Sequence, residues 1–461
     1  MQKRFFPWFF LLILLCAVLL YLLFGHLLIQ AMYDGKSLPF LNQIIEGRGT
    51  VPLEHYLEYA NQWVWTVFAL GAILFLALGL RIAGGVTLFL ISFFSLTLFL
   101  FSLLEIFPSL ASLLHLNRLP YYAYRTTIIS DEKLVFRNRP FHHMKFSHYR
   151  GELYSSSYGV EVTPILYETF KDKDGFNNSI DRAAADMVVL GDSYIEYGAD
   201  KEDAFSRRLE QASGLSALNL GVGNYGPSQY LEIFKQYGLG KKSRVALFCF
   251  FAGNDLLDIA EYEKWVKGDN YYRVLPPRNF FRRYLLVMAQ IAQFARNSFY
   301  PKEKRFDLID LKLKEEHRKV VFGYLNDTHS PEEIAASAEW QKLANILKEF
   351  KSLSLENHIF PVVIYIPTVA QIYAQYSTEQ SDPGWLQMKD QQIAAKSNLE
   401  QTLLSLSQKI GVELVSLSPV FELAAKEGKE LYYPFDTHWN SEGREVAARF
   451  VAERLKELQR F

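Results

Sequence analysis

The chain has few cysteines and almost no excess of charge. Only two cysteines, Cys16 and Cys249, occur in 461 residues. Cys16 lies in an apolar run and Cys249 in an expected buried strand, so no disulfide between them is expected. A domain outside the cytoplasm would then depend on its core for stability, because it lacks disulfides. The 49 basic and 50 acidic residues leave a formal charge of −1, which gives no reason to expect a nucleic-acid partner.

Long apolar runs are concentrated before about residue 107. Residues 5–31 are almost uninterrupted in apolar character and exceed the roughly 20 residues that a helix needs to span a bilayer. A cleavable signal peptide is the alternative, but the run is long and lacks a small-residue cleavage site. Further runs follow at 63–80 and 86–107. Buried soluble helices would be another interpretation, yet runs without charged faces favour three membrane-spanning helices.

Positive charges near these runs predict the orientation of the anchor. Lys3 and Arg4 precede the first run, and Arg81 lies in the short turn between the other two. Cytoplasmic segments are enriched in Lys and Arg, so both places are expected on the cytoplasmic side. Residues 32–62 then form an external loop. The chain is therefore expected to be a multi-pass integral membrane protein, in contact with lipid through residues 1–107, with its remaining residues extracytoplasmic.

From about residue 181 the pattern predicts an α/β domain. Short apolar runs that predict buried strands occur at 187–190, 217–220, 245–251, 360–366 and 412–417. Amphipathic helices are expected at 202–212, 228–237, 332–355, 386–410 and 441–458. This alternation predicts a parallel sheet with helices on both faces, a three-layer α/β/α domain over residues 181–461.

Two regions do not follow that alternation. Residues 108–180 are mixed in character and are interpreted as a linker with a small β element. Residues 259–330 are rich in aromatic and basic side chains and are predicted to form a mostly helical insertion near the mouth of the sheet. The insertion could be a solvated excursion of no special role, a lid, a substrate-docking face or a patch that touches lipid headgroups.

The first residues of chemical interest follow the first expected strand. Gly191-Asp192-Ser193 comes directly after 187–190, which places Ser193 at the carboxyl end of a parallel strand, where open α/β sheets bind ligands. Taken alone, the tripeptide could equally be the N-cap of a helix.

The loops after the second and third strands contain candidate hydrogen-bond donors. Residues 219–226 include several glycines, which allow close approach of the backbone to a ligand and expose amides such as those of Gly223 and Asn224. A dinucleotide loop is the alternative, but the spacing of the third glycine is wrong for it. Asn254, in Gly253-Asn254-Asp255 after the third strand, can donate its side-chain amide into the same region.

The last candidate group is Asp436-Thr437-His438-Trp439, just before the final helix. Asp436 can accept the Nδ1 proton of His438, which leaves Nε2 to take a proton from a serine. The same Asp-x-His spacing also suits a metal ion. No second His/Asp/Glu cluster completes such a site in the sequence, so neither a metal nor another cofactor is expected.

In this order, the four groups resemble the blocks of the SGNH/GDSL hydrolases, which supply Ser, Gly, Asn and His. The resemblance covers about residues 170–461. It implies a catalytic triad of Ser193, His438 and Asp436. It further implies an oxyanion hole built from the Ser193 amide, the amide of Gly223 or Asn224, and the Asn254 side chain.

Three features depart from the common family pattern. Tyr194 stands where an aliphatic residue is usual, and Asn224 stands at the position that is most often glycine. Asp436 and His438 are two residues apart rather than three. This Asp-x-His-Trp form is similar to that of alginate O-acetylation proteins.

The resemblance implies a membrane-anchored serine esterase or O-acyltransferase that acts on ester-linked groups, acetyl above all, of a cell-envelope glycan. A membrane-bound acyltransferase is an expected partner. A lipase or thioesterase acting on lipid is the alternative enzyme. A non-catalytic membrane scaffold that retains the fold is the alternative from another class.

Overall fold

A computed structural model describes residues 97, 100–101, 128–141, 143–147, 166–200, 202–267, 284–292 and 308–458. The predicted membrane runs at 5–31 and 63–80, the loop at 32–62 and nearly all of 86–107 lie outside these residues. Within the described ranges, no helix is both long and apolar enough to span a bilayer.

The chain divides into two compact units. Residues 1–129 and 274–301 form one unit, and residues 130–273 and 302–461 form the other. In the first unit, residues 284–292 are helical. The buried Tyr284 hydroxyl lies 2.8 Å from the Thr97 hydroxyl, and its ring packs edge-on against Phe101 with centroids 5.6 Å apart. Part of the predicted insertion therefore packs within the unit that contains the third apolar run.

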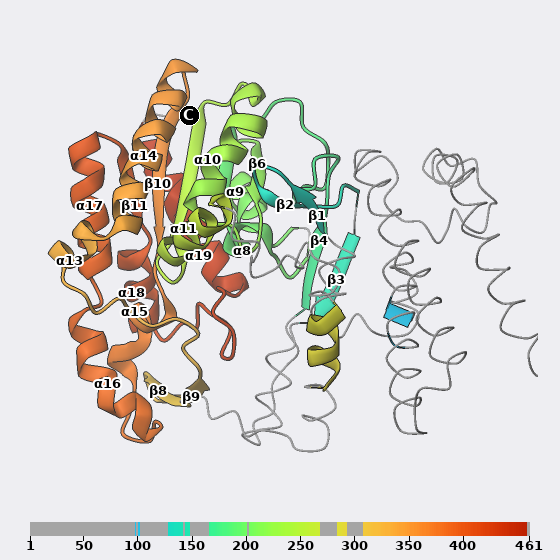
Figure 1. The fold of residues 1–461 in the computed structure, drawn as a ribbon. Coiled ribbons are helices and arrows are strands. Elements are labelled where there is room, and N and C mark those ends of the chain that lie inside the picture. Colours follow the sequence, from blue (N-terminus) through green and yellow to red (C-terminus); the bar gives the residue numbers. More distant parts are fainter. Residues whose placement is uncertain are drawn as a thin grey trace, which may run out of the picture. The chain divides into compact units, whose positions relative to one another are not determined.

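A five-stranded parallel sheet forms the centre of the second unit (Figure 1). Its strands are β5 (Met187–Gly191), β6 (Ala217–Gly221), β7 (Val245–Phe251), β10 (Phe360–Ile366) and β11 (Glu413–Ser416). Every strand lies within one residue of the predicted range. Strands buried on both faces give continuous apolar runs, which explains the close agreement.

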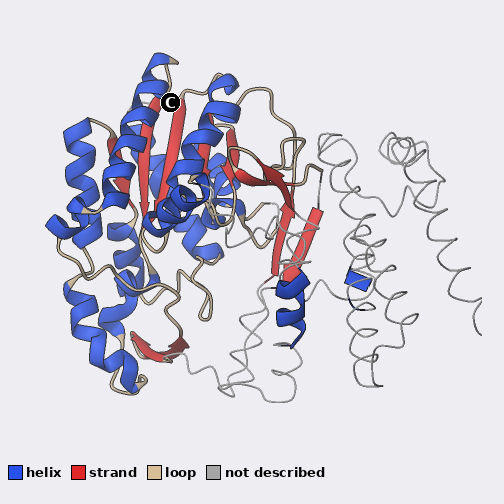
Figure 2. Cartoon of the chain, in the orientation of Figure 1, coloured by secondary structure: helices blue, strands red, loops and turns tan. Residues whose placement is uncertain are grey.

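Helices cover both faces of this sheet, as the flanking blue ribbons in Figure 2 show. On one face lie α9 (Phe205–Ser213), α18 (Ser418–Lys426) and α19 (Ser441–Glu457), whose apolar residues form one core cluster with alternate residues of the strands. On the other face lie α10 (Pro227–Ile233), α11 (Asp255–Val266) and α14 (Ala338–Glu356). There the Phe248 ring packs against Tyr230 and Phe350. The predicted α/β class with a parallel sheet is confirmed.

The remaining helices are α8 (Ser193–Glu196), α13 (Pro331–Ala336), α15 (Val369–Tyr373), α16 (Pro383–Ala394), α17 (Asn398–Ile410), the π-helix η3 (Phe234–Gly238) and the 3₁₀ helices η4 (Leu239–Lys241) and η5 (Ala374–Tyr376).

Two of the predicted long helices are each interrupted. The helix predicted at 332–355 is divided because Ser337 has an extended backbone and its side chain accepts from Trp340 N, starting a new helix. The helix predicted at 386–410 is divided into α16 and α17.

Short β elements lie outside the main sheet. β1 (Ile128–Asp131) pairs with β2 (Val135–Asn138), β3 (His143–Ser147) with β4 (Leu166–Phe170), and β8 (Ile309–Leu313) with β9 (Glu316–Val320). Residues 130–180, interpreted from the sequence as a linker, belong to the same compact unit as the sheet.

The hairpin of β8 and β9 was not predicted within the insertion at 259–330, of which residues 259–266 and 284–292 are helical. The apolar residues Ile309, Leu311 and Leu313 occur at every second position and are buried, which is the period of a strand and not of a helix. Residues 268–283 and 293–307 of the insertion lie outside the described residues.

The strand order β11-β10-β7-β5-β6 determines where a ligand can bind. After β5 the chain moves to β6 at one side, and then returns to β7 on the other side of β5. The loops after β5 and β7 therefore leave the sheet in opposite directions. In open parallel sheets, ligands bind beyond the carboxyl ends of the strands at such a reversal. Ser193 follows β5 and Asn254 follows β7.

Candidate active site

Ser193 lies at a sharp turn between β5 and α8. Asp192 is the N-cap of α8, and its side chain accepts from Tyr194 N at 2.9 Å, so Ser193 is the first helical residue and not the cap. Gly191 permits this turn because a Cβ at that position would clash with Ile195. Ser193 is half-buried.

The segment before α19 brings a histidine to this serine. His438 Nε2 lies 2.8 Å from Ser193 Oγ, across 245 residues of sequence. On the other side of the ring, His438 Nδ1 lies 2.5 Å from Asp436 Oδ1. The Asp436 side chain is only 1% exposed and that of His438 is 12% exposed. A buried carboxylate of this kind can fix the ring with Nε2 directed at the serine hydroxyl.

Tyr194 links the two halves of this arrangement. Its hydroxyl donates to Thr437 O, and its own carbonyl accepts from Trp439 Nε1 at 3.1 Å. Its ring centroid lies 5.0 Å from that of His438. Tyr194 stands where an aliphatic residue is usual in the family pattern, and its hydroxyl holds the loop that contains His438. An aliphatic residue could not make that hydrogen bond.

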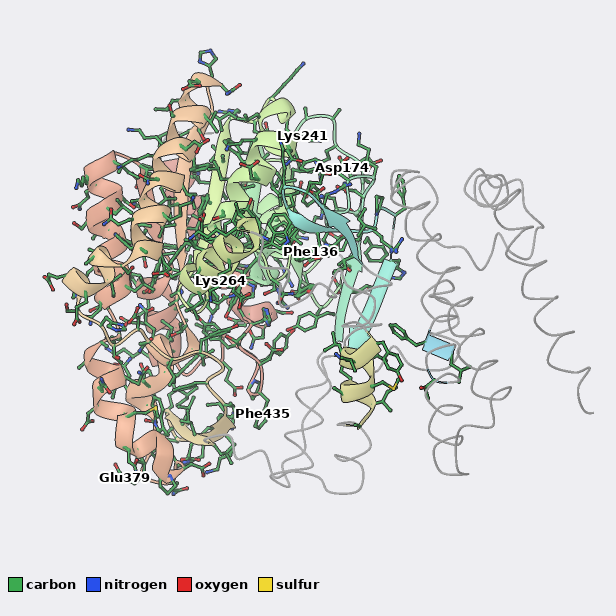
Figure 3. The ribbon with its side chains drawn as sticks, viewed as in Figure 1. Phe136, Asp174, Lys241, Lys264, Glu379 and Phe435 are labelled. Atoms are coloured by element: carbon green, nitrogen blue, oxygen red, sulfur yellow. The ribbon has the colours of Figure 1, made fainter. Side chains whose placement is uncertain are left out.

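A buried arginine holds the same loop from α19. Arg444 is 1% exposed and donates to Trp439 O at 2.7 Å. It also forms an ion pair with buried Asp203 and donates to the Tyr433 hydroxyl at 3.1 Å. Phe435, labelled in Figure 3, marks the loop immediately before Asp436. The loop is therefore held from both α8 and α19.

The candidate oxyanion donors lie at the ends of their predicted strands, and two of them are already hydrogen-bonded to carboxylates. Gly223 N donates to Glu196 Oε2 at 2.5 Å. Buried Asn254 donates from Nδ2 to Asp258 Oδ2 at 2.6 Å, which leaves the second hydrogen of that amide group for another acceptor. Asn224 has a left-handed backbone, with φ of 64°.

Burial perturbs the acidic residues behind the serine. Burial raises the pKa of Asp192 to about 6, although the Tyr194 amide and His438 act in the opposite direction. Burial, together with Asp192 and Asp258, also holds the pKa of Asp255 well above its ordinary value. Asp255 accepts from the Tyr230 hydroxyl at 2.9 Å and from Phe251 N at 3.0 Å.

The raised pKa of Asp192 predicts a pH-dependent stability. Between about pH 4 and pH 6 the unfolded state releases this proton while the folded state retains it, so the free energy of unfolding falls as pH rises. The total loss is about 3 kcal/mol, complete above about pH 6. Asp192→Asn should lack this component, because Asn cannot titrate but its Oδ1 can still accept from Tyr194 N.

Chemical unfolding of the wild type and Asp192→Asn from pH 4 to pH 7 measures the effect. Asp390→Asn, at an exposed position, is the control. Curves for the wild type and Asp192→Asn that remain parallel over this range would contradict the prediction.

No group of three or more His, Cys, Asp or Glu side chains that could hold a metal ion occurs in the part of the chain that the structure describes. Asp436 and His438, the pair considered for a metal from the sequence, are hydrogen-bonded to each other, and His438 is also hydrogen-bonded to Ser193. Cys249 is a buried free thiol in β7.

Comparison with known proteins gives one family match. Residues 325–461 match the family described as SGNH hydrolase-like domain, acetyltransferase AlgX. No curated protein matches the chain in sequence.

Among solved structures, a protein of Parabacteroides merdae described as a GDSL-like lipase is 11% identical with a TM-score of 0.33, covering 60% of this chain and 96% of its own. The carbohydrate acetylesterase Est24 of Sinorhizobium meliloti is 10% identical with a TM-score of 0.29, covering 59% and 98%. The family match covers the segment that contains Asp436 and His438, and it identifies residues 325–461 as similar to an SGNH hydrolase-like domain.

Proposed function

We propose that this protein is a serine esterase or O-acyltransferase that acts on acyl esters through an acyl-serine intermediate. The main support is the hydrogen-bonded series from Ser193 Oγ to His438 Nε2 at 2.8 Å and from His438 Nδ1 to Asp436 at 2.5 Å. The match to an SGNH hydrolase-like family agrees with this chemistry.

In the proposed first half-reaction, Ser193 Oγ attacks the ester carbonyl while His438 Nε2 takes the hydroxyl proton. Asp436 holds the ring and stabilises the imidazolium that forms. The tetrahedral intermediate collapses when the ester C–O bond breaks, and His438 gives its proton to the leaving alkoxide. The products of this half-reaction are an alcohol and an acyl ester of Ser193.

The negatively charged oxygen of the tetrahedral intermediate requires hydrogen-bond donors that are already in position. We propose the Ser193 amide, the Asn224 amide and the second Nδ2 hydrogen of Asn254. Each such donor typically stabilises a transition state by about 3–4 kcal/mol. Gly223 was the other candidate from its loop, but its amide is bonded to Glu196.

In the second half-reaction, an acceptor hydroxyl gives its proton to His438 and attacks the acyl carbon. The bond between the acyl carbon and Ser193 Oγ then breaks, and His438 returns the proton to Ser193. Water as the acceptor gives an esterase, and a sugar hydroxyl gives a transferase. The same three side chains serve both reactions, so the exclusion of water from the acyl-enzyme decides between them.

We further propose acetyl esters of a cell-envelope glycan as the substrate class. The Asp-x-His-Trp form of residues 436–439 and the acetyltransferase named in the matching family's description support this choice. Three spanning helices within residues 1–107 would keep the domain on the extracytoplasmic side of the membrane. There a membrane-bound acyltransferase could supply acyl groups.

The acyl chain-length preference tests this proposal. With aryl esters as substrates, we expect kcat/KM for the acetate to exceed that for an octanoate by about tenfold or more, or at least about 1.4 kcal/mol in the transition state. A preference for the long chain would instead favour a lipase or thioesterase. Failure of a fluorophosphonate to label Ser193, together with no turnover of either ester, would favour a non-catalytic scaffold.

A further inference from the structure

Glu196 is a buried acid beside the proposed nucleophile that the catalytic scheme does not use. It is the last residue of α8, which begins with Ser193. Its side chain is 3% exposed, and both of its carboxylate oxygens are hydrogen-bonded. A fully enclosed carboxylate requires compensating partners, and these partners indicate its role.

One oxygen is anchored by the region that precedes the sheet. Glu196 Oε1 forms an ion pair with Lys171 Nζ, whose side chain is 1% exposed, and accepts from Asn138 Nδ2 at 2.8 Å. The Glu196 carbonyl also accepts from Asn177 Nδ2 at 2.5 Å. Asn138 ends β2, two residues after Phe136, which is labelled in Figure 3. The end of β2 and residues 171–177 therefore support the helix that starts at Ser193.

The other oxygen holds the loop after β6. Glu196 Oε2 accepts from Gly223 N. A Cβ at Gly223 would lie 3.0 Å from that same oxygen and 2.8 Å from the Tyr197 hydroxyl, and a Cβ at Gly221 would lie 2.8 Å from Glu196 N. The glycines are therefore needed for the close approach of this turn to α8. Asn224 follows directly in a left-handed conformation.

We propose that Glu196 is a positioning residue that presets the 221–224 turn as one side of the oxyanion hole. This inference rests on the proposed function. A carboxylate accepting from a backbone amide makes a short, strong hydrogen bond, and donors that are held before reaction need no reorganisation as the oxyanion forms.

Lys171 has a distinct part in this arrangement. An unpaired carboxylate next to the hole would repel the negative oxygen of the intermediate. The buried ammonium of Lys171 neutralises Glu196, so the pair can hold the turn without that penalty. Removing Lys171 alone should therefore impair catalysis, and removing both charges while keeping an oxygen acceptor should restore it.

The test compares Glu196→Ala, Lys171→Met and the double variant Lys171→Met/Glu196→Gln in the full-length protein. The substrate is an aryl acetate, and kcat is expressed per active site, with the sites counted by fluorophosphonate titration. Each single variant should lower this kcat about 10- to 100-fold, with KM changed less than about twofold. The double variant should return to within about threefold of the wild type, because the side-chain carbonyl of the introduced glutamine can still accept from Gly223 N.

Glu210 provides a matched control at the opposite end of β6. It also pairs with a cation, Arg182, at 2.6 Å, and its Oε1 accepts from the first amide of the strand, Ala217 N, at 2.8 Å. Glu210→Ala should lower stability by a similar amount. Its kcat per titrated site should remain within about twofold of the wild type, since it lies far from the hole.

A kcat for Glu196→Ala within about twofold of the wild type would overturn the proposal. An equal loss of kcat in Glu210→Ala would also overturn the proposal. A double variant whose kcat is no higher than that of Lys171→Met would overturn it as well. If the single variants do not fold, Lys171→Met/Glu196→Leu, which lacks the acceptor for Gly223 N, is compared with Lys171→Met/Glu196→Gln. A kcat at least about tenfold lower in the leucine variant supports the role of Glu196, and equal kcat values contradict it. A wild type that neither labels nor turns over would instead reject the proposed function itself, and this role with it.

Discussion

Replacing Ser193 by alanine is expected to lower kcat for an aryl acetate by about 10⁴- to 10⁶-fold. The substitution removes the oxygen that would form the acyl ester, and His438 Nε2, now 2.8 Å from that hydroxyl, would have no proton to accept. Binding should persist, so KM should change little. Steady-state turnover of the purified full-length protein, together with fluorophosphonate labelling, measures the effect.

Ser206→Ala is a suitable control for this variant. Ser206 is a buried serine in α9, so the substitution also removes an enclosed hydroxyl, but away from His438. It should retain near-wild-type kcat. Retention of a tenth of the activity by Ser193→Ala would exclude Ser193 as the nucleophile.

Asp436→Asn is expected to lower kcat by about 10⁴-fold with little change in KM. Asn has nearly the same shape, but it presents an amide hydrogen that can face Nδ1 of His438. The ring would then hold its proton on Nε2, which could not accept from Ser193. The loss arises from the wrong tautomer rather than from misfolding, so the melting temperature should fall only slightly.

Asp186→Asn provides the comparison for Asp436→Asn. Asp186 precedes β5 at the end of the sheet opposite to Ser193, where it accepts from the Ser216 hydroxyl at 2.6 Å. Its loss should affect stability while kcat stays close to that of the wild type. Equal kcat values for Asp436→Asn and the wild type would remove Asp436 from the proposed mechanism.

The sheet could be predicted closely from the sequence, while some connecting elements could not. Each central strand is a continuous apolar run, so its position follows from composition alone. The division of residues 332–355 at Ser337 depends on a side-chain cap, and a serine is equally compatible with a helix interior facing solvent. The β8–β9 hairpin was missed because aromatic and basic residues nearby obscured the alternation of Ile309, Leu311 and Leu313.

In the candidate site too, residues that lie in short sequence motifs could be predicted, while residues that meet only in the folded chain could not. Ser193 and His438 could be proposed because each lies in a short motif placed after a strand or before a helix, and the structure brings them within hydrogen-bonding distance. Glu196 gave no such signal. Its partners Lys171 and Asn138 are 25 and 58 residues away in sequence, and neither lies in a motif, so only the folded chain places them together.

The membrane anchor at residues 1–107 stays a prediction from the sequence, and the proposed chemistry does not depend on it. The proposed chemistry does require a covalent acyl group on one serine.

Acid quenching of the protein during turnover of an acetyl ester, followed by mass analysis of its peptides, tests the account most directly. We predict an acetyl group on the peptide that contains Ser193, present during turnover and absent from Ser193→Ala. Turnover by the wild type with no acetylated serine, or with the acetyl group on another residue, would contradict the account.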